Sequence, residues 1–327
     1  MLTRRQLIAA SAGLVAAGTG FVPRARAQTV KKPVRIIVGF PAGGGTDIAS
    51  RILAEKLRGP YASTVLVENR PGASARLAAE YVKNAEPDGA TLMSAPEFVV
   101  TLYPSVFKAL SYDPVRDFVH VAPAYRSMLS FNIGPGVPES VKNLRDFVQW
   151  CKENPTKANF ATTSAGGSPH FIGVMLANEA KTAINAVHYR GGAPALQDLV
   201  GGHIAASVNP VSEIMTQAQG TIRMLAVTGS KRSAFLPDVP TMSEQGYNVV
   251  LDTWFGLFAP AKTPPEVVQA LNSQLFELSR SKEMADAWAK VGAEPHHQTP
   301  AQLTETVKAD IARWSAVVKA SGFVALE

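Results

Sequence analysis

Two glycine-rich segments of similar composition are the strongest candidates for a binding site. Residues 41–47 read Pro-Ala-Gly-Gly-Gly-Thr-Asp, and residues 164–170 read Ser-Ala-Gly-Gly-Ser-Pro-His. Glycines let the backbone approach a ligand and turn its N–H groups toward it, and a following helix adds unpaired N–H groups and a positive dipole end. Each segment predicts an anion-binding loop, with an empty strand-to-helix turn as the alternative. The candidate ligand contacts are Ala42, Gly43, Gly44, Gly45, Thr46, Asp47, Ser164, Ala165, Gly166, Gly167, Ser168 and His170.

Asp47 allows two interpretations. A carboxylate in the first turn of a helix is favoured by the helix dipole and can cap the helix, which is a structural role. The alternative is that Asp47 meets a cationic group on the ligand.

A serine hydrolase is the alternative interpretation of the second loop. Residues 162–166 are close to the nucleophile elbow G-x-S-x-G, and aspartate and histidine residues follow Ser164 in hydrolase order. However, Thr162 stands where the elbow needs a small residue, and no H-G-G-G-type oxyanion loop precedes it. The loops also match neither G-x-x-x-x-G-K-[ST] nor G-x-G-x-x-G, and no H-E-x-x-H occurs. We therefore expect a non-enzymatic binding site without a cofactor or a metal ion.

The elements that must position these loops alternate between strand and helix. β-branched runs predict strands, and apolar residues at helical spacing predict helices, for example from Ile48 to Leu57. This alternation is typical of α/β folds, in which mainly parallel sheets are covered on both faces and ligands bind at the carboxyl ends of the strands. The expected strands are 34–40, 64–68, 90–95, 119–125, 128–133, 159–163, 186–189, 204–208 and 223–227. The further expected helices are 73–83, 140–153, 169–180, 193–200 and one that opens with the capping box at Thr299.

Composition and charge narrow the class of protein. The chain has 327 residues, 46% of them hydrophobic, which is enough for two globular domains. Its net charge of +6 is concentrated at the start: removing four arginines before residue 28 leaves 28 basic against 26 acidic residues. A nearly neutral body excludes a nucleic-acid-binding protein. The single cysteine, Cys151, excludes an internal disulfide and is expected to be a buried thiol.

Residues 1–27 have the composition of an export signal. A basic start is followed by about 15 apolar residues and a small-x-small end, Ala25-Arg26-Ala27, which predicts cleavage before Gln28. Arg4 and Arg5 indicate a twin-arginine signal, and a general secretory signal is the alternative. The apolar stretch is shorter than the roughly 20 residues of a membrane span. We therefore expect a soluble periplasmic protein.

From about residue 32 onward the chain resembles the Bug-type receptors, the periplasmic solute-binding proteins of tripartite tricarboxylate transporters. The segment V-E-N-R-P-G-A at residues 67–73 is highly specific for them. The loop at 42–47 resembles the family's P-G-G-x-x-D, and the loop at 164–170 resembles its second ligand loop. Further matches lie at residues 86–89, 112–114, 116–118, 189–199, 236–241 and 254–260.

The resemblance implies a two-domain clamshell, or Venus flytrap, that closes on a small organic acid. Domain 1 would comprise residues 28–126 plus 254–327, and domain 2 residues 127–253. The first loop would hold a ligand carboxylate and the second loop the other end of the ligand, with Gly191 and Asn209 as further contacts. The implied partners are a mono- or dicarboxylate, an aromatic acid or an acidic amino acid, and the membrane subunits of a transporter. The receptor would be a monomer, and service in signalling instead of uptake stays open.

The sequence departs from the family pattern at three places. Ala42 replaces a frequent proline, His188 replaces the usual proline before Tyr189, and Pro96-Glu97 occupies a third loop where small polar residues are usual. Glu97 would either face solvent or cap the next helix, or contact a positive or hydrogen-donating group of the ligand. The second interpretation makes the ligand an amino acid or a hydroxylated or protonated acid.

Overall fold

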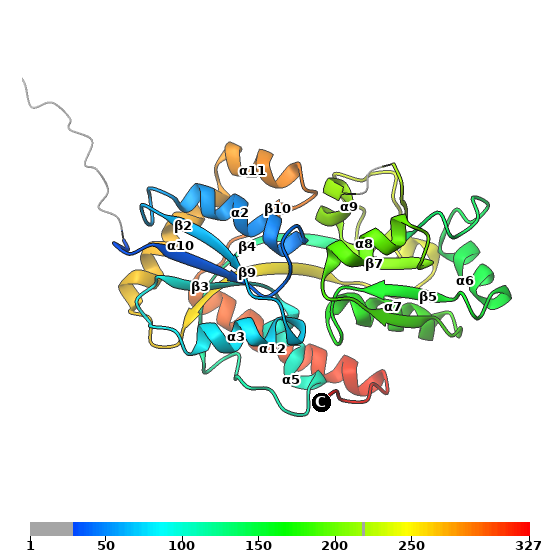
Figure 1. Cartoon of the computed structure of the whole chain (residues 1–327), viewed down its shortest axis with the longest axis horizontal. Coiled ribbons are helices and arrows are strands. Elements are labelled where there is room, and N and C mark those ends of the chain that lie inside the picture. Colours follow the sequence, from blue (N-terminus) through cyan, green and yellow to red (C-terminus); the bar gives the residue numbers. More distant parts are fainter. Residues whose placement is uncertain (1–28, 218–219) are drawn as a thin grey trace, which may run out of the picture.

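Two long strands connect the two lobes of the molecule. The computed structural model describes residues 29–217 and 220–327, so the expected signal segment 1–27 lies outside the described residues. Strands β4 (Phe118–Ile133) and β9 (Asp252–Pro260) pair antiparallel and run through the middle of the molecule (Figure 1). β4 pairs with β9 as far as Met128, and from Leu129 onward it pairs with strands of the other lobe.

The first lobe is built on the strand order β2-β1-β3-β9-β4. The first three strands are parallel. β9 then pairs antiparallel with β3, and β4 pairs antiparallel with β9. The long C-terminal helix packs against β4, α4 and α5. The elements are β1 (Val34–Val38), α2 (Gly45–Leu57), β2 (Val65–Asn69), η1 (Ala73–Ala75), α3 (Arg76–Lys83), β3 (Thr91–Pro96), α4 (Phe98–Thr101), α5 (Tyr103–Val106), α10 (Pro265–Ser279), α11 (Lys282–Ala289), β10 (Glu294–Pro295) and α12 (Pro300–Ala320).

The second lobe repeats this arrangement. Strands β6, β5 and β7 are parallel, and β4 then pairs antiparallel with both β7 and β8. The domain boundaries at 126/127 and 253/254 stay a prediction, which the change in strand partners after Met128 supports. The elements are α6 (Leu144–Glu153), β5 (Asn159–Thr162), α7 (Ser168–Glu179), β6 (Asn185–His188), α8 (Gly192–Val200), β7 (Ala206–Pro210), α9 (Val211–Gln217), β8 (Arg223–Val227) and η2 (Ser243–Gln245).

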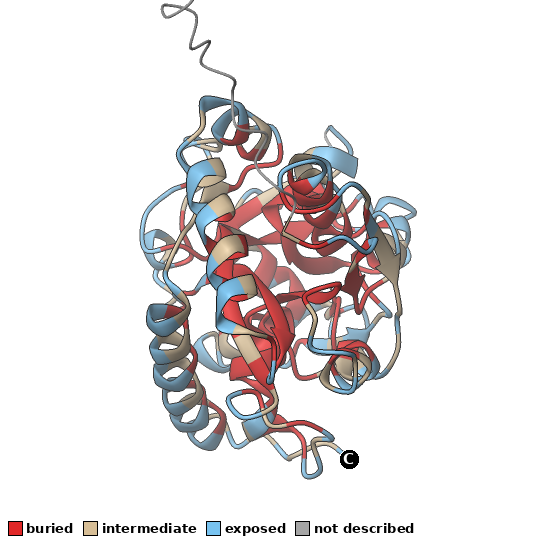
Figure 2. Cartoon of the chain, turned by 90° about the vertical axis from the view of Figure 1, so that its left-hand side faces the viewer, coloured by how far each residue is buried: buried red, intermediate tan, exposed pale blue. Residues whose placement is uncertain are grey.

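The sheets form the core, and the helices cover them with one apolar face each. Figure 2 shows the buried strands enclosed by helices whose outer faces are exposed. Where the lobes join, Tyr125 stacks on Phe255 at 4.5 Å and lies 4.6 Å from the Trp288 ring, so β4, β9 and α11 are packed together at the crossing. Among residues 29–217 and 220–327, no helix combines the length and apolar composition that a membrane span needs.

Several predicted elements are confirmed and some need correction. The capping box at Thr299 is present, and Cys151 is buried. The two strands expected at 119–125 and 128–133 are one continuous strand, β4, and strand β9 was not predicted. Helix α6 begins at Leu144, four residues later than expected, because Asn143 caps it through the Asp146 amide. The helix expected from 73 begins at Arg76, because residues 73–75 adopt left-handed backbone conformations.

Candidate functional site

Three helices begin at one buried pocket between the lobes. α2 comes from the first lobe, and α7 and α8 come from the second. Each follows a parallel strand and has a glycine at its N-cap, namely Gly44, Gly167 and Gly191. The cavity measures about 30 Å³ and is lined by Phe40, Gly44, Gly45, Thr46, Pro96, Phe98, Leu129, Thr163, Ser168, Pro169, Gly192, Pro210, Glu213, Thr253 and Phe255. The positive dipole ends of three helices therefore meet at one place.

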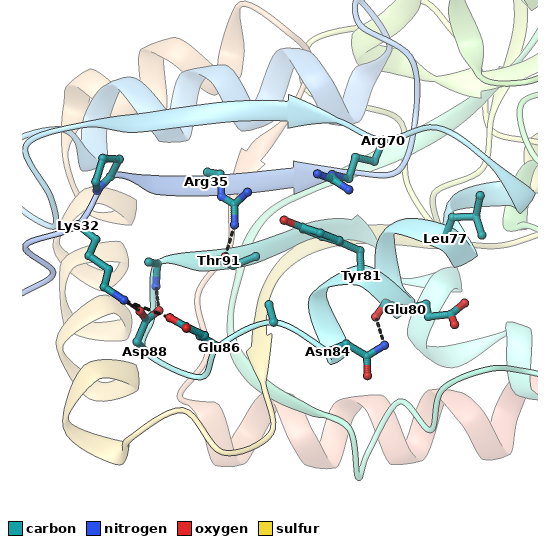
Figure 3. A pocket seen from close by; sticks show the side chains of 13 residues that line it. Lys32, Arg35, Arg70, Leu77, Glu80, Tyr81, Asn84, Glu86, Asp88 and Thr91 are labelled. Carbon is teal, nitrogen blue, oxygen red and sulfur yellow. Dashed lines mark hydrogen bonds and ion pairs between the residues drawn. The ribbon is translucent and has the colours of Figure 1, made fainter.

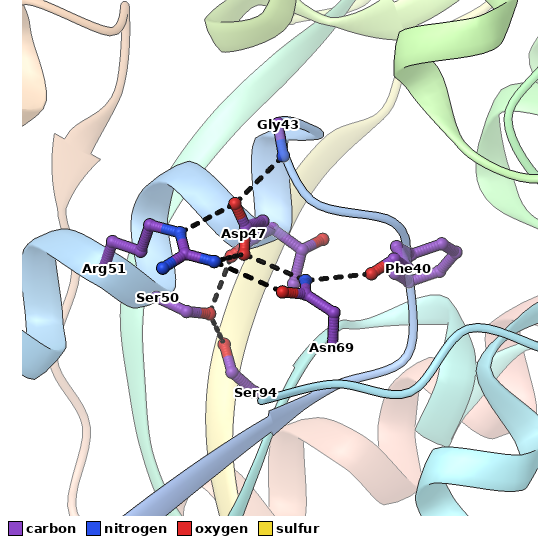
Figure 4. Close-up of polar contacts among 8 residues, drawn as sticks. Phe40, Gly43, Asp47, Ser50, Arg51, Asn69 and Ser94 are labelled. Atoms are coloured by element: carbon purple, nitrogen blue, oxygen red, sulfur yellow. Dashed lines mark hydrogen bonds and ion pairs between the residues drawn. The ribbon is translucent and has the colours of Figure 1, made fainter. Parts of the chain in front are cut away.

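The first loop is held in shape by Asp47. Its buried carboxylate accepts hydrogen bonds from the Gly43 amide and from Asn69, each over 2.9 Å, and from two nitrogens of Arg51 (Figure 4). Burial alone would raise the pKa of Asp47, but the bonds from Arg51, Gly43 and Asn69 hold this pKa below its ordinary value. These partners all lie in the lobe of Asp47, which favours the structural role, and a contact between Asp47 and a ligand stays a prediction. Ser50 extends the network to Ser94 over 2.8 Å.

The second loop is also tightly packed. Gly166 has a φ of +73°, a conformation that favours glycine, and its amide donates to Nδ1 of His170 over 3.2 Å. Burial and the neighbouring His188 lower the pKa of His170 to about 4, so the imidazole is neutral near pH 7. Ser164 is buried and shares a 2.7 Å hydrogen bond with Tyr103 of the first lobe. Its hydroxyl therefore has a tyrosine as its partner, where a hydrolase would need a histidine.

Glu97 lies in the core between the lobes, so its interpretation as a solvent-exposed or helix-capping residue is wrong. The residue is 0% exposed, and its side chain makes no capping hydrogen bond to α4. One carboxylate oxygen accepts from Ser168 of the second lobe, and the other accepts from Thr253 over 2.6 Å. Burial raises the pKa of Glu97 to about 7 despite these two bonds. Glu97 therefore connects the third loop to the start of α7.

A second buried carboxylate, Glu213, was missed in the sequence. It lies on α9, is 4% exposed, and accepts a hydrogen bond from the Gly45 amide of the opposite lobe over 2.7 Å. Asn209 donates to its other oxygen over 2.8 Å. Burial raises the pKa of Glu213 against these two bonds. The available signal was that Glu213 follows the strand ending at Pro210, in one more loop at the carboxyl end of a strand.

The other predicted contacts divide into three groups. Gly44, Gly45, Thr46, Pro96 and Ser168 line the cavity. The residues outside the lining are the buried Asp47, Glu97, Ser164, Gly166, Gly167, His170 and Asn209, and the half-buried Ala165. Ala42 and Gly43 are exposed and do not line the cavity. Sequence reasoning missed the apolar lining, above all Phe40, Phe98 and Phe255, because aromatic residues near strand ends resemble ordinary core residues.

A groove beside the cavity forms its outer part. It measures about 410 Å³ and shares Phe40 and Thr163 with the cavity. Gly191, at a φ of +111°, lines this groove opposite Pro41, and a β-carbon on Gly191 would lie 2.8 Å from the Pro41 ring. Arg190 also lines the groove. The predicted contact Gly191 is therefore located at the junction between the groove and the start of α8.

A larger surface groove on the first lobe is a weaker candidate for anion binding. It measures about 880 Å³, and its charged groups mostly bind one another (Figure 3). Lys32 contacts Glu86 and Asp88, and the Arg70 guanidinium lies 3.6 Å from the centre of the Tyr81 ring. Its cations are thus neutralised or stacked, whereas the first residues of three helices line the interlobe cavity.

Comparison with known proteins decides the family. A family model described as the tripartite tricarboxylate transporter family receptor matches residues 49–323. The chain belongs to this receptor family. It is 32% identical over 318 residues to protein BugT of Bordetella pertussis, and the match covers 95% of this chain and 96% of BugT.

Several solved structures match the fold. An R. palustris protein solved with adipate superposes with a TM-score of 0.86 at 29% identity, covering 90% of this chain and 98% of that protein. The periplasmic binding protein BugD gives 0.84 at 29% identity over 90% and 99% of the two chains. MatC from Rhodopseudomonas palustris, with bound malate, gives 0.80 at 26% identity over 88% and 98%. The α/β two-domain clamshell predicted for this chain is confirmed.

Proposed function

We propose that this protein is a periplasmic receptor that captures a small organic acid between its lobes and delivers it to the membrane subunits of a tripartite tricarboxylate-type transporter. The observation that carries the proposal is the convergence of the N-termini of α2, α7 and α8, from two lobes, on one buried cavity. Such termini favour a negatively charged ligand group. Two similar proteins solved with adipate and with malate bind acids of this kind.

Closure of the lobes is the physical basis of capture. Gly45 and Glu213, Ser168 and Glu97, and Tyr103 and Ser164 are hydrogen-bonded pairs that join the lobes beside the cavity. A cavity of about 30 Å³ has room for roughly two water molecules, so an organic acid requires the lobes to separate and close again around it. A ligand that contacts both lobes shifts the population toward the closed state.

A thermal-shift screen tests this proposal. The purified mature protein is heated with mono- and dicarboxylates, aromatic acids and amino acids, because a ligand that binds only the folded state raises its melting temperature. At 100 times its Kd a ligand adds about 2.7 kcal/mol to the free energy of unfolding. We expect at least one acid to raise the melting temperature in a concentration-dependent way. No shift with any acid, together with turnover of a generic ester, would instead support the hydrolase.

A deletion experiment in cells distinguishes a role in uptake from a role in signalling. Deleting the chromosomal copy of the receptor should abolish uptake of the acid found in the screen, and restoring the full-length chain should restore uptake. Unchanged uptake with loss of a transcriptional response to the acid would assign the receptor to signalling.

A further inference from the structure

The cavity proposed to take an organic acid is itself lined by a carboxyl group. Glu213 is its only charged lining residue, and neither lysine, arginine nor histidine lines it in the described part of the chain. Glu97, the second buried carboxylate, lies directly behind Ser168 and Thr253 of the lining. A dicarboxylate would therefore enter a space that already contains a carboxylate, and like charges at short distance in a buried site repel strongly.

Glu213 also accepts a hydrogen bond from a backbone amide that the first loop would otherwise donate to a ligand carboxylate. The Gly45 N–H, at the first position of α2, donates to Oε1 of Glu213 over 2.7 Å. The start of α8 is equally close, because a β-carbon built on Gly192 would lie 2.0 Å from Oε2 of Glu213. Glu213 thus accepts a hydrogen bond that the first loop was predicted to donate to a bound anion.

Polar atoms around Glu213 lack hydrogen-bond donors. A carboxylate can accept about four hydrogen bonds, and Glu213 accepts two, from Gly45 and Asn209. The buried Oδ1 of Asn209, an acceptor, has no partner among the described residues, and neither has the Ser212 hydroxyl, which can donate as well as accept. Buried polar atoms in folded proteins are nearly always paired, so the free acceptor positions of Glu213 and Asn209 leave room for a donor that a ligand supplies.

We propose that Glu213 is the specificity-determining residue of the pocket and selects an acid that also carries a protonated amine, with the ammonium group facing Glu213 and Asn209. This inference rests on the proposed receptor function and narrows its ligand class to zwitterionic acids. The ligand carboxylate then points away from Glu213, toward the start of α7 and the groove lined by Arg190. Phe40, Phe98 and Phe255 pack against the carbon skeleton.

Matched pairs of acids test the inference on the wild-type protein. Succinate, malate and aspartate share a skeleton and differ in one substituent, as do glutarate and glutamate, and 3-phenylpropionate and phenylalanine. Calorimetry should give the amino acid of at least one set a Kd at least 10-fold lower than that of the plain acid, with the hydroxy acid between them. Plain acids that bind as tightly as or more tightly than their amino counterparts in every set would overturn the inference and leave the receptor function intact.

The variant Glu213→Gln keeps the shape of the side chain and removes its charge. We expect it to lower the affinity for the amino acid at least 10-fold. We also expect it to remove or reverse the preference for the amino acid over the plain acid in each set. Glu80→Gln, on the surface groove, is the matched control and should leave the preference unchanged. An unchanged preference in Glu213→Gln would contradict the inference. Absence of binding by all these acids to the wild type would overturn the receptor function as well, and if the variant does not fold, the wild-type sets decide.

Discussion

The carboxylate of Glu213 accepts a hydrogen bond from the backbone amide of Gly45 over 2.7 Å, although the two residues are 168 positions apart and lie on opposite lobes. A second contact runs in the other direction, because Glu97 of the first lobe accepts from Ser168 at the start of α7. Each lobe therefore contributes one buried carboxylate to the beginning of a helix on the other lobe. Closing the lobes assembles both contacts at the same cavity.

The space around Glu213 makes Gly192 sensitive to substitution. In Gly192→Ala the new β-carbon would lie 2.0 Å from Oε2 of Glu213, so the carboxylate must move. We expect the ligand Kd measured by calorimetry to rise at least 10-fold. Gly246→Ala is the control, because nothing lies within 4 Å of its β-carbon and Gly246 does not line the cavity, and its Kd should stay within about threefold of the wild-type value. Equal Kd values for the two variants would contradict this packing argument.

The Ser164–Tyr103 contact predicts a structural role for both hydroxyl groups. Ser164→Ala removes the 2.7 Å hydrogen bond, which should lower the free energy of unfolding by about 1 kcal/mol in denaturant titrations. Tyr103→Phe also removes the bond from Tyr103 to the Ser74 carbonyl and should cost more. In the double variant the loss should be smaller than the sum of the two, because both variants remove the bond between Ser164 and Tyr103. Covalent labelling of Ser164 by a fluorophosphonate would contradict this role and favour the hydrolase.

The Asp47 network predicts a larger loss of stability than a surface ion pair. Arg51→Gln removes two hydrogen bonds to a buried carboxylate, and we expect the free energy of unfolding to fall by about 1–2 kcal/mol. The control, Lys282→Gln, breaks an exposed pair with Asp286 and should cost no more than about 0.5 kcal/mol. Urea titrations compare the two, and equal losses would show that the network does not hold the first loop.

Glu97 predicts a characteristic pH dependence of stability. Its pKa is raised by burial to about 7 from the ordinary 4.5, so the folded state binds the proton more tightly than the unfolded chain. The contribution of Glu97 to the free energy of unfolding is complete below about pH 4.5 and falls as the pH rises through about 7. Its size is on the order of 3 kcal/mol at most.

Glu97→Gln isolates this contribution. The lowered pKa of His170 acts in the opposite direction between about pH 4 and 6.5, so the difference between variant and wild type is the useful quantity. We expect the stability of the variant relative to the wild type to increase from pH 5 to pH 8 in thermal melts. A difference that does not change with pH would show that Glu97 titrates as it does in the unfolded chain.

The fold was largely predictable because its signals are local. Hydrophobic spacing and turn residues are short-range properties, so most strands and helices lie where they were expected. The left-handed residues Ala73, Ser74 and Ala75 carry no such signal, because alanine and serine rarely adopt this conformation. Strand β4 was divided in two because Arg126 and Ser127 interrupt its apolar run, although β9 and β10 pair with this stretch.

The binding loops were predictable for the same reason, and the charges inside the cavity were not. Gly44 and Gly167 follow strands and precede helices in the sequence itself. The burial of Glu213 and Glu97 depends instead on the opposite lobe, which supplies Gly45 and Ser168 from distant parts of the chain. Likewise, Asp47 and Glu97 are both acidic residues near strand-to-helix turns, and only the tertiary contacts distinguish the loop-holding carboxylate from the one between the lobes.

The most direct test of the account is a crystal structure of the mature protein with the acid that raises its melting temperature most. We predict that the ligand lies between the two lobes, with its carboxylate toward the start of α7 at Ser168 or the groove lined by Arg190, and its carbon skeleton against Phe98 and Phe255. A ligand bound instead in the surface groove beside Tyr81, or outside the space between the lobes, would contradict the account.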